Sequence, residues 1–302
     1  MASVGALSDG WLERDGVGLH YLEWLPESAR GAEPPLLLLH GLSSNARYWE
    51  RLARYFPDRR LVALDQRGHG LTGQPERAPK FPDGFAMDQL LQDVVVLAAE
   101  LGLGKPVVVG HSWGATIALE LVGTRPGSAS GLVFIDGPVQ SAANLFSWEE
   151  AQTLMQPPLP RFATFEDAVA QSKLDFEGTW DQDLEPFVKA RVIPDGDALV
   201  LTLTAPVRLE LLRGLYDAQP DVLWPRVDVP AAVLLAKHGP ARISRSKEAG
   251  AARLQELAPS VEVSWYDSPH DIPLYKAAEV ASAIERVALL AAGSSASQAT
   301  AG

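Results

Sequence analysis

The fold of this chain is decided by residues 105–122, KPVVVGHSWGATIALELV. The three valines predict a short buried strand, and residues 113–124 predict a helix. Between them, Gly110, Ser112 and Gly114 form a G-x-S-x-G pattern, which in a strand-to-helix context is typical of a nucleophilic serine on a tight turn. Such a turn needs glycines because neighbouring backbone passes close to it. Ser112 is therefore the candidate nucleophile, and a serine that only caps the helix is the alternative.

Short apolar runs on both sides of this segment predict a mostly parallel sheet with helices on both faces, an α/β fold. The expected parallel strands lie at residues 35–40, 61–64, 107–109, 132–135, 231–236 and 261–266. Two further runs, at residues 11–14 and 19–24, flank an Asp15-Gly16 turn signal and predict an N-terminal antiparallel hairpin. Helical patterns with apolar positions three and four residues apart alternate with these strands, at residues 87–101, 246–257 and 278–290.

The alternation of strand and helix breaks after Asp136 and resumes only at residue 231. A structureless loop of this length is uncommon inside a compact domain, so residues 137–226 are predicted to be an inserted helical lid. Residues 1–136 and 227–292 would then form the core. Residues 293–302, GSSASQATAG, are small and polar and are expected to be disordered.

The composition of the 302 residues limits the classes of partner and site. A net charge of −12 disfavours binding to nucleic acid or anionic membranes, because phosphates require a basic surface. The chain lacks cysteine and has neither a signal-peptide pattern nor a membrane-spanning run, so a cytoplasmic location is expected. We expect a small-molecule substrate and no cofactor or metal, and leave open a homo-oligomer.

Two backbone N–H groups are candidates for stabilising an oxyanion beside Ser112. The first belongs to Trp113, at the start of the predicted helix, where the helix dipole is positive. The second belongs to Leu42, which follows His40-Gly41 at the end of a strand. This role uses only the backbone N–H, so a leucine side chain at position 42 is compatible with it.

Four segments together resemble the ordered landmarks of the α/β-hydrolase superfamily. They are HGLSSNARYW (residues 40–49), DQRGHGLTGQP (65–75), GHSWGA (110–115) and SPHDIPL (268–274). The resemblance implies an eight-stranded sheet and a catalytic triad in the chain order nucleophile, acid, histidine. The superfamily contains many chemistries, so the resemblance does not select one.

The resemblance points to His270 as the general base, since this histidine follows the last strand, and His238 is its rival. Most members carry the acid after the strand that corresponds to residues 231–236. Here that region reads AKHGPARISRS and contains no carboxylate. Some members place the acid one strand earlier, where this chain has Asp136. Asp136 is therefore the expected acid, with a simple Asp136-Gly137 turn as the alternative.

These residues predict a serine hydrolase that cleaves a small to medium, largely apolar carboxylic ester or lactone through an acyl-enzyme. Aromatic residues of the predicted lid are expected to contact the substrate: Trp148, Phe162, Phe165 and Trp180. Ser112 stands where the related dehalogenases and epoxide hydrolases require aspartate, which excludes their mechanisms. A cofactor-independent dioxygenase or lyase that uses the His/Asp pair for proton abstraction remains an alternative, as does a non-catalytic receptor.

Overall fold

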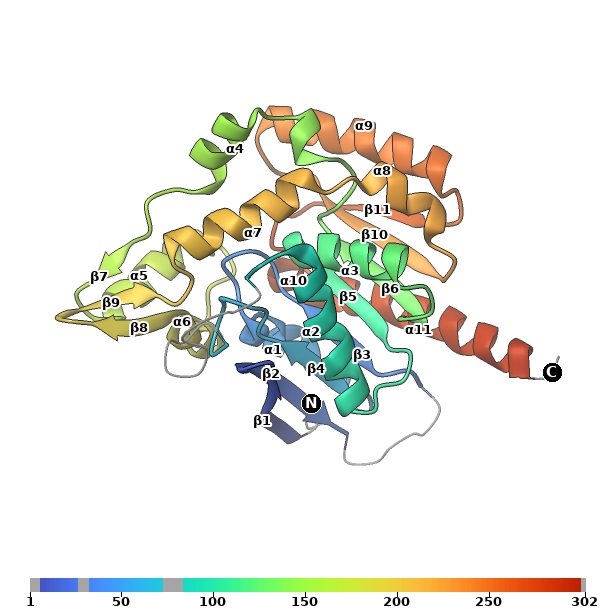
Figure 1. Cartoon of the computed structure of the whole chain (residues 1–302), viewed down its shortest axis with the longest axis horizontal. Helices are drawn as coiled ribbons and strands as arrows, with labels where there is room; N and C mark the ends of the chain where they lie inside the picture. Colours follow the sequence, from blue (N-terminus) through green and yellow to red (C-terminus); the bar gives the residue numbers. More distant parts are fainter. Residues whose placement is uncertain (1–5, 27–32, 73–83, 300–302) are drawn as a thin grey trace.

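A twisted eight-stranded sheet forms the centre of the molecule (Figure 1). The computed structural model describes residues 6–26, 33–72 and 84–299. The strand order is β1-β2-β4-β3-β5-β6-β10-β11, in which β1, β2 and β4 pair antiparallel and the other pairs are parallel. The strands are β1 (Ala6–Arg14), β2 (Val17–Leu25), β3 (Leu36–Leu39), β4 (Leu61–Leu64), β5 (Val107–His111), β6 (Gly131–Ile135), β10 (Ala231–Ala236) and β11 (Glu262–Tyr266). The predicted α/β architecture is confirmed.

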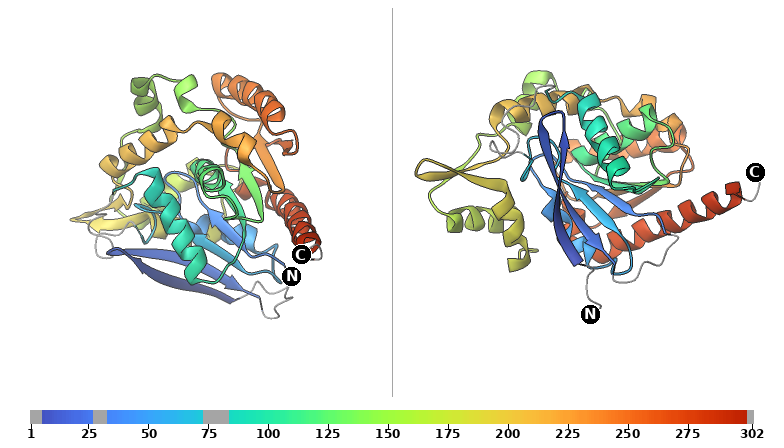
Figure 2. Two further views of the ribbon diagram at one scale, coloured as in Figure 1. Left: turned by 45° about the vertical axis from the view of Figure 1, so that its right-hand side comes forward. Right: turned by 60° about the horizontal axis from the view of Figure 1, so that its bottom comes forward.

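Both faces of the sheet are covered, because alternate residues of each strand point to opposite sides. Leu37 and Leu39 of β3 belong to one apolar core, which includes residues of α2 (Met87–Glu100), α3 (Trp113–Thr124) and α9 (Ala241–Leu257). Leu36 and Leu38 belong to a second core, with residues of α1 (Glu50–Ala53), α10 (Ile272–Tyr275) and α11 (Ala277–Ala299). Figure 2 shows the two helical layers on either side of the strands. This two-sided burial explains why the strands read as continuous apolar runs.

The C-terminal helix corrects one expectation. Residues 293–302 were expected to be disordered, but α11 continues to Ala299; residues 300–302 lie outside the described part. Alanine and glutamine are good helix formers, so a small polar composition is compatible with an extended helix. None of the helices in the described ranges is both long and apolar enough to cross a bilayer.

Residues 137–226 were predicted to form a helical lid. The structure shows that this insertion contains strands as well as helices. Its α-helices are α4 (Trp148–Met155), α5 (Phe165–Asp175), α6 (Glu185–Arg191), α7 (Ala205–Asp217) and α8 (Pro220–Leu223). It also contains an antiparallel sheet of order β7-β9-β8, made of β7 (Arg161–Phe162), β8 (Val192–Asp195) and β9 (Ala198–Leu201). The missed signal is Asp195-Gly196 between two apolar runs, a hairpin pattern in which Gly196 takes a φ of +65°.

The insertion is attached to the core at several points. Trp224 is fully buried in the core and packs edge-on against Phe134 of β6, with ring centroids 4.9 Å apart. The Asn45 side-chain amide donates to the Phe187 carbonyl of α6 over 2.9 Å. Arg51 of α1 forms an ion pair with Asp183 of the insertion. The end of the insertion is therefore part of the core packing, and α6 is held against the loop after β3.

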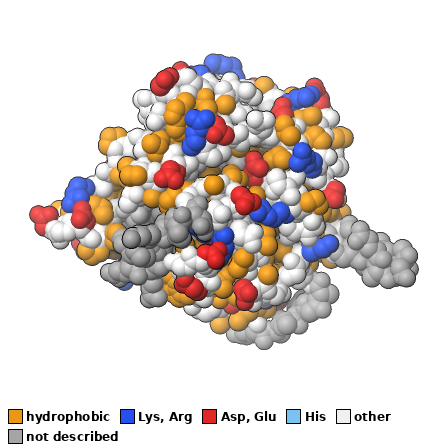
Figure 3. Space-filling view, viewed as in Figure 1, with side chains coloured by type: hydrophobic (Ala, Val, Ile, Leu, Met, Phe, Trp, Pro, Cys, Tyr) orange, Lys and Arg blue, Asp and Glu red, His pale blue; other side chains and the backbone are white. Residues whose placement is uncertain are grey.

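Acidic and basic side chains are mixed with apolar ones on the face drawn in Figure 3, rather than gathered by sign. The net charge of −12 is thus spread on this face without a visible charged patch. Small-molecule sites in proteins are concave, so we expect a small ligand to bind in a cavity and not on this surface.

Candidate active site

Ser112 lies on a strained turn between β5 and α3. Its φ of 53° and ψ of −116° are rarely adopted by a non-glycine residue, and such strain is concentrated at functional sites. A Cβ on Gly114 would lie 2.1 Å from the Leu39 carbonyl oxygen, and one on Gly110 would lie 2.4 Å from the Gly114 carbonyl oxygen. Gly114 therefore allows α3 to approach β3 this closely, and Gly110 allows the first turn of α3 to approach the end of β5. The turn places Ser112 at the N-terminus of α3, as the sequence predicts.

His270 and Asp136 form a hydrogen-bonded pair beside Ser112. The distance from His270 Nδ1 to Asp136 Oδ2 is 2.5 Å, and the Asp136 carboxylate is fully buried. Ser112 and His270 line the same cavity. Asp136 directly follows β6 and has a φ of 50°, and its N–H donates to the Leu234 carbonyl over 2.7 Å. The structure thus brings together the three residues expected to form a triad.

The electrostatics of the pair suit a general base held by a carboxylate. Burial disfavours protonation of His270, but the hydrogen bond and negative charge of Asp136 outweigh it, so the His270 pKa is raised. Burial would raise the pKa of Asp136, but the bond to His270 and the positive charge of Lys247 lower it instead. Asp136 therefore stays ionised and can stabilise an imidazolium on His270.

Lys247 contacts Asp136, and the sequence reasoning missed this contact. Its ammonium, on α9, lies 2.6 and 2.7 Å from the two oxygens of Asp136. The Ala236 N–H donates to the same carboxylate over 2.9 Å. The segment after β10 has no carboxylate near its start, but it supplies the Lys247 ammonium to Asp136, the residue that follows β6. The sequence gives no signal for this contact, because it depends on how α9 packs.

Removing the Lys247 charge should shift the pH dependence of activity. Lys247 lowers the pKa of His270, so Lys247→Met should raise it. Because the base must be neutral, the acidic limb of kcat/KM should move to higher pH. A pH–rate profile measures this shift, with Lys237→Met, an exposed lysine after β10, as the control. An unchanged acidic limb in Lys247→Met would mean that Lys247 does not tune the base.

The two expected oxyanion donors meet at Ser112. Trp113 is the first residue of α3, and Leu42 lines the cavity with Ser112. A Cβ on Gly41 would lie 3.3 Å from the Ser112 Cβ, so the loop after β3 passes directly beside the nucleophile. A Cβ at position 41 would also lie 3.1 Å from His111 Nδ1, so a side chain there would fit only if its neighbours moved by a few tenths of an ångström. The glycine therefore keeps the Leu42 amide close to the site.

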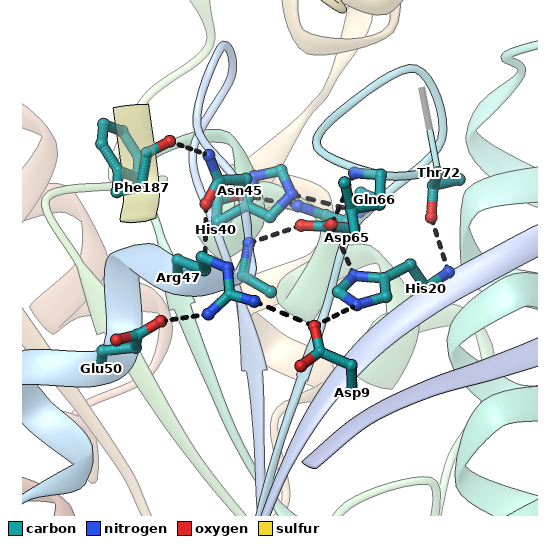
Figure 4. Close-up of polar contacts among 12 residues, drawn as sticks. Asp9, His20, His40, Asn45, Arg47, Glu50, Asp65, Gln66, Thr72 and Phe187 are labelled. Atoms are coloured by element: carbon teal, nitrogen blue, oxygen red, sulfur yellow. Dashed lines mark hydrogen bonds and ion pairs between the residues drawn. The ribbon is translucent and has the colours of Figure 1, made fainter. Parts of the chain in front are cut away.

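A buried carboxylate fixes the loop that carries Leu42. Asp65 accepts hydrogen bonds from the N–H groups of Ala46 (2.6 Å) and Leu71 (2.8 Å), and its Oδ2 lies 2.8 Å from His20 Nδ1. Figure 4 shows this network around Asp65, with the Asn45 bond to Phe187 at its edge. Asp65 thus holds the loop and does not line the cavity with Ser112.

His40 and His69 also hold this loop, in neutral form. The Gln66 N–H donates to His40 Nε2 over 3.1 Å, and the Ser43 N–H donates to His69 Nε2 over 3.0 Å. Burial lowers the pKa of His69 to about 3. His238, the rival candidate for the general base, is exposed, and its Nε2 lies 2.7 Å from Asp267 Oδ1. It does not line the cavity with Ser112.

The cavity beside Ser112 has a volume of about 240 Å³, and other aromatic residues line it than those predicted. Its aromatic residues are Tyr48, Phe176 and Phe187. The four predicted contacts lie elsewhere: Trp148 packs against Tyr216, Phe162 borders a smaller cavity, Phe165 borders an open groove of about 1080 Å³, and Trp180 lies under Lys173. The sequence showed that the insertion is rich in aromatic residues, but it did not show which of them line the cavity beside Ser112.

The cavity is also more polar than the mainly apolar pocket expected from the sequence. Asp175, Arg191 and Asp271 line it. His111 lines it too: its Nε2 donates to the His270 carbonyl over 3.1 Å, and its ring stacks on Tyr48 at 5.0 Å. Burial lowers the pKa of His111 to about 4, so this histidine is neutral and positions the backbone of the base.

Comparison with known proteins agrees with this fold. A family model described as the alpha/beta hydrolase fold matches residues 34–226. Epoxide hydrolase 3 of Mus musculus is 32% identical over 137 residues, which are 45% of this chain and 35% of that protein. Lipase LipV of Mycobacterium tuberculosis is 35% identical over 104 residues, 34% of this chain and 37% of the lipase. The chain thus spans little more than a third of the length of these relatives.

A solved structure extends the likeness to nearly the whole chain. E-2-(acetamidomethylene)succinate hydrolase has a TM-score of 0.73 and covers 93% of this chain and 99% of its own, at 20% identity. Identity at this level shows a shared fold alone. Because the family model matches more than half of the 302 residues, the resemblance read from the motifs is confirmed, and the protein belongs to the α/β-hydrolase family.

Proposed function

We propose that the protein is a serine hydrolase that cleaves small to medium carboxylic esters or lactones through an acyl-enzyme. The observation that carries the proposal is the hydrogen bond from buried Asp136 to His270, which lines the same cavity as Ser112 on its strained turn. The hydrolases among the matched proteins support the general class. The serine at position 112 separates the proposed chemistry from mechanisms that need an aspartate nucleophile.

The proposed reaction has two halves. Ser112 Oγ attacks the carbonyl carbon while His270 takes its proton, and the Leu42 and Trp113 N–H groups stabilise the oxyanion. The imidazolium then protonates the leaving alcohol, which departs and leaves the acyl group on Ser112. A water molecule, deprotonated by His270, attacks this ester, and Ser112 recovers its proton as the carboxylic acid leaves.

Labelling with a fluorophosphonate probe tests the proposal, together with turnover of p-nitrophenyl acetate. We expect a covalent adduct on Ser112, identified by peptide mass spectrometry, and release of p-nitrophenol. Ser112→Ala should give neither. A protein that is folded, unlabelled and inactive would instead favour proton abstraction by the His270–Asp136 pair, or a binding role without catalysis.

A further inference from the structure

Arg191 is a cation beside the nucleophile that the proposed mechanism does not use. It is the last residue of α6 and lines the cavity that contains Ser112 and His270. Its backbone is fixed on two sides. The Arg191 carbonyl accepts the Thr202 N–H over 2.8 Å, and Asn45 binds the Phe187 carbonyl one turn earlier in α6. The end of α6 that carries Arg191 is therefore held in place beside this cavity, and Arg191 also borders two smaller cavities of about 30 and 10 Å³.

This guanidinium has no hydrogen bond or ion pair with any residue in the described ranges. Its contact is with the Phe187 ring, whose centroid lies 5.2 Å from Arg191 Cζ. Other buried arginines are paired: Arg67 with Asp93 at 2.5 Å, for example. A cation that is partly removed from water without a counter-charge is costly, so the site favours an anionic ligand.

Two carboxylates line the cavity, but neither forms an ion pair with the Arg191 guanidinium, so the guanidinium can still bind an anionic ligand. Asp175 is exposed to solvent and accepts from Gln171, and Asp271 accepts from the Tyr48 hydroxyl over 3.2 Å. Both favour the charged form of Arg191 at longer range, whereas burial opposes it. Neither carboxylate lies within ion-pair distance of the guanidinium.

A second cation strengthens the positive potential on this side. The Arg208 guanidinium, on α7, donates to Ser43 Oγ and to the Met155 carbonyl, the latter over 2.7 Å. Ser43 borders the same cavity as Arg191. The positive charge of Arg191 contributes to lowering the pKa of Arg208, after the larger effect of burial. Arg208 is occupied by these bonds, so Arg191 is the arginine with free donors.

We propose that Arg191 determines specificity by binding a second, ionised carboxylate on the acyl group of a small ester or lactone substrate. A planar guanidinium fork matches a carboxylate with two parallel hydrogen bonds. The volume of about 240 Å³ limits the acyl group to a few non-hydrogen atoms. This proposal replaces the largely apolar substrate expected from the sequence and rests on the proposed function.

Two esters of similar shape test the proposal. Monomethyl succinate carries the carboxylate, and methyl 4-oxopentanoate replaces it with a neutral methyl ketone. The wild-type protein should have the lower KM for monomethyl succinate. Arg191→Met should raise that KM roughly ten- to a hundredfold, because a charge-assisted hydrogen bond is lost, and should leave the KM for the ketone ester within about twofold. Arg191→Lys keeps the positive charge but loses the planar guanidinium fork. Its KM for monomethyl succinate should lie between the values of the wild-type protein and Arg191→Met.

The matched control is Arg161→Met, an exposed arginine of β7 paired with Asp195 at the far end of the insertion, which should change neither KM. The melting temperature of Arg191→Met should fall little, because no hydrogen bond or ion pair to a described residue is lost and only the contact of the guanidinium with the Phe187 ring is removed. Equal KM values for the two esters in the wild-type protein, or an unchanged KM for monomethyl succinate in Arg191→Met, would overturn the proposal.

Binding of succinate to the Ser112→Ala protein separates this inference from the proposed function. Isothermal titration calorimetry should detect binding that Arg191→Met removes in the same background. If succinate binds through Arg191 but no ester is cleaved and Ser112 is not labelled, the hydrolase proposal fails and the anion site stands. If esters are cleaved and succinate binding does not depend on Arg191, the anion site is wrong and the hydrolase proposal stands.

Discussion

Replacing Asp136 with asparagine should lower kcat by about 10⁴-fold, the loss found when the orienting aspartate of a serine triad becomes an amide. Asp136 accepts the proton of His270 Nδ1, which leaves Nε2 free to take the proton of Ser112. An asparagine amide can donate to Nδ1 instead, and this places the ring proton on Nε2. The base is then unable to accept a proton from the nucleophile. Steady-state kinetics with p-nitrophenyl acetate would measure the loss.

The control for Asp136→Asn is Asp267→Asn, which removes an exposed carboxylate three residues before the base. We expect near wild-type kcat for this variant. Circular dichroism should show that Asp136→Asn is folded, since the Ala236 N–H can still donate to an asparagine oxygen. Activity of Asp136→Asn near that of the wild type would show that another group orients His270.

Replacing Gly114 with alanine should be the most destabilising of the variants considered. The new Cβ would lie 2.1 Å from the Leu39 carbonyl oxygen and 2.6 Å from that of His40, and both are backbone atoms of a buried strand end. Relief requires α3 to move away from β3, which also displaces Ser112 and the Trp113 N–H. We expect a loss of about 3 kcal/mol or more in the free energy of unfolding, measured by denaturant titration, together with loss of activity.

Gly214→Ala provides the matched control within another helix. A Cβ at Gly214, in α7, would meet nothing within 4 Å. The same substitution there should stabilise the protein by roughly 0.5–1 kcal/mol, because alanine has the higher helix propensity. If Gly114→Ala were as stable and as active as the wild type, the close approach of α3 to β3 would not be needed for the turn at Ser112.

The core was predictable because burial on both faces leaves a simple pattern in the sequence. The bounds of β4 and β10 match the apolar runs at residues 61–64 and 231–236, and α3 matches residues 113–124. The placement of Asp136 beside His270 was implied by the resemblance to the α/β-hydrolase superfamily, and it agrees with the convergence of the ends of neighbouring parallel strands on one crevice. In this part of the fold, local pattern and topology agree.

The insertion and the charged contacts were not predictable in the same way. The orientation of an aromatic residue such as Phe187 depends on how short helices pack on the loop after β3, and composition does not specify this. The same holds for Lys247, which reaches Asp136 from α9; this helix packs against the segment after β6, where a Cβ on Gly250 would lie 2.4 Å from the Val139 carbonyl oxygen. Arg191 carries no local signal at all. The role proposed for it rests on its position at the cavity and on the absence of a hydrogen bond or ion pair to any described residue.

The division of the site between core and insertion has a consequence for how new specificities can arise. Ser112, Asp136 and His270 all lie outside residues 137–226, whereas Arg191 and Phe187 lie within them. The proposed catalytic residues and the proposed specificity residue are therefore encoded in separate stretches of the gene, although core residues such as Leu42 and Tyr48 also line the cavity. An exchange of this segment that retains the tie to Asn45 and the packing of Trp224 would give the same catalytic residues a different ligand, by recombination rather than by redesign of the triad.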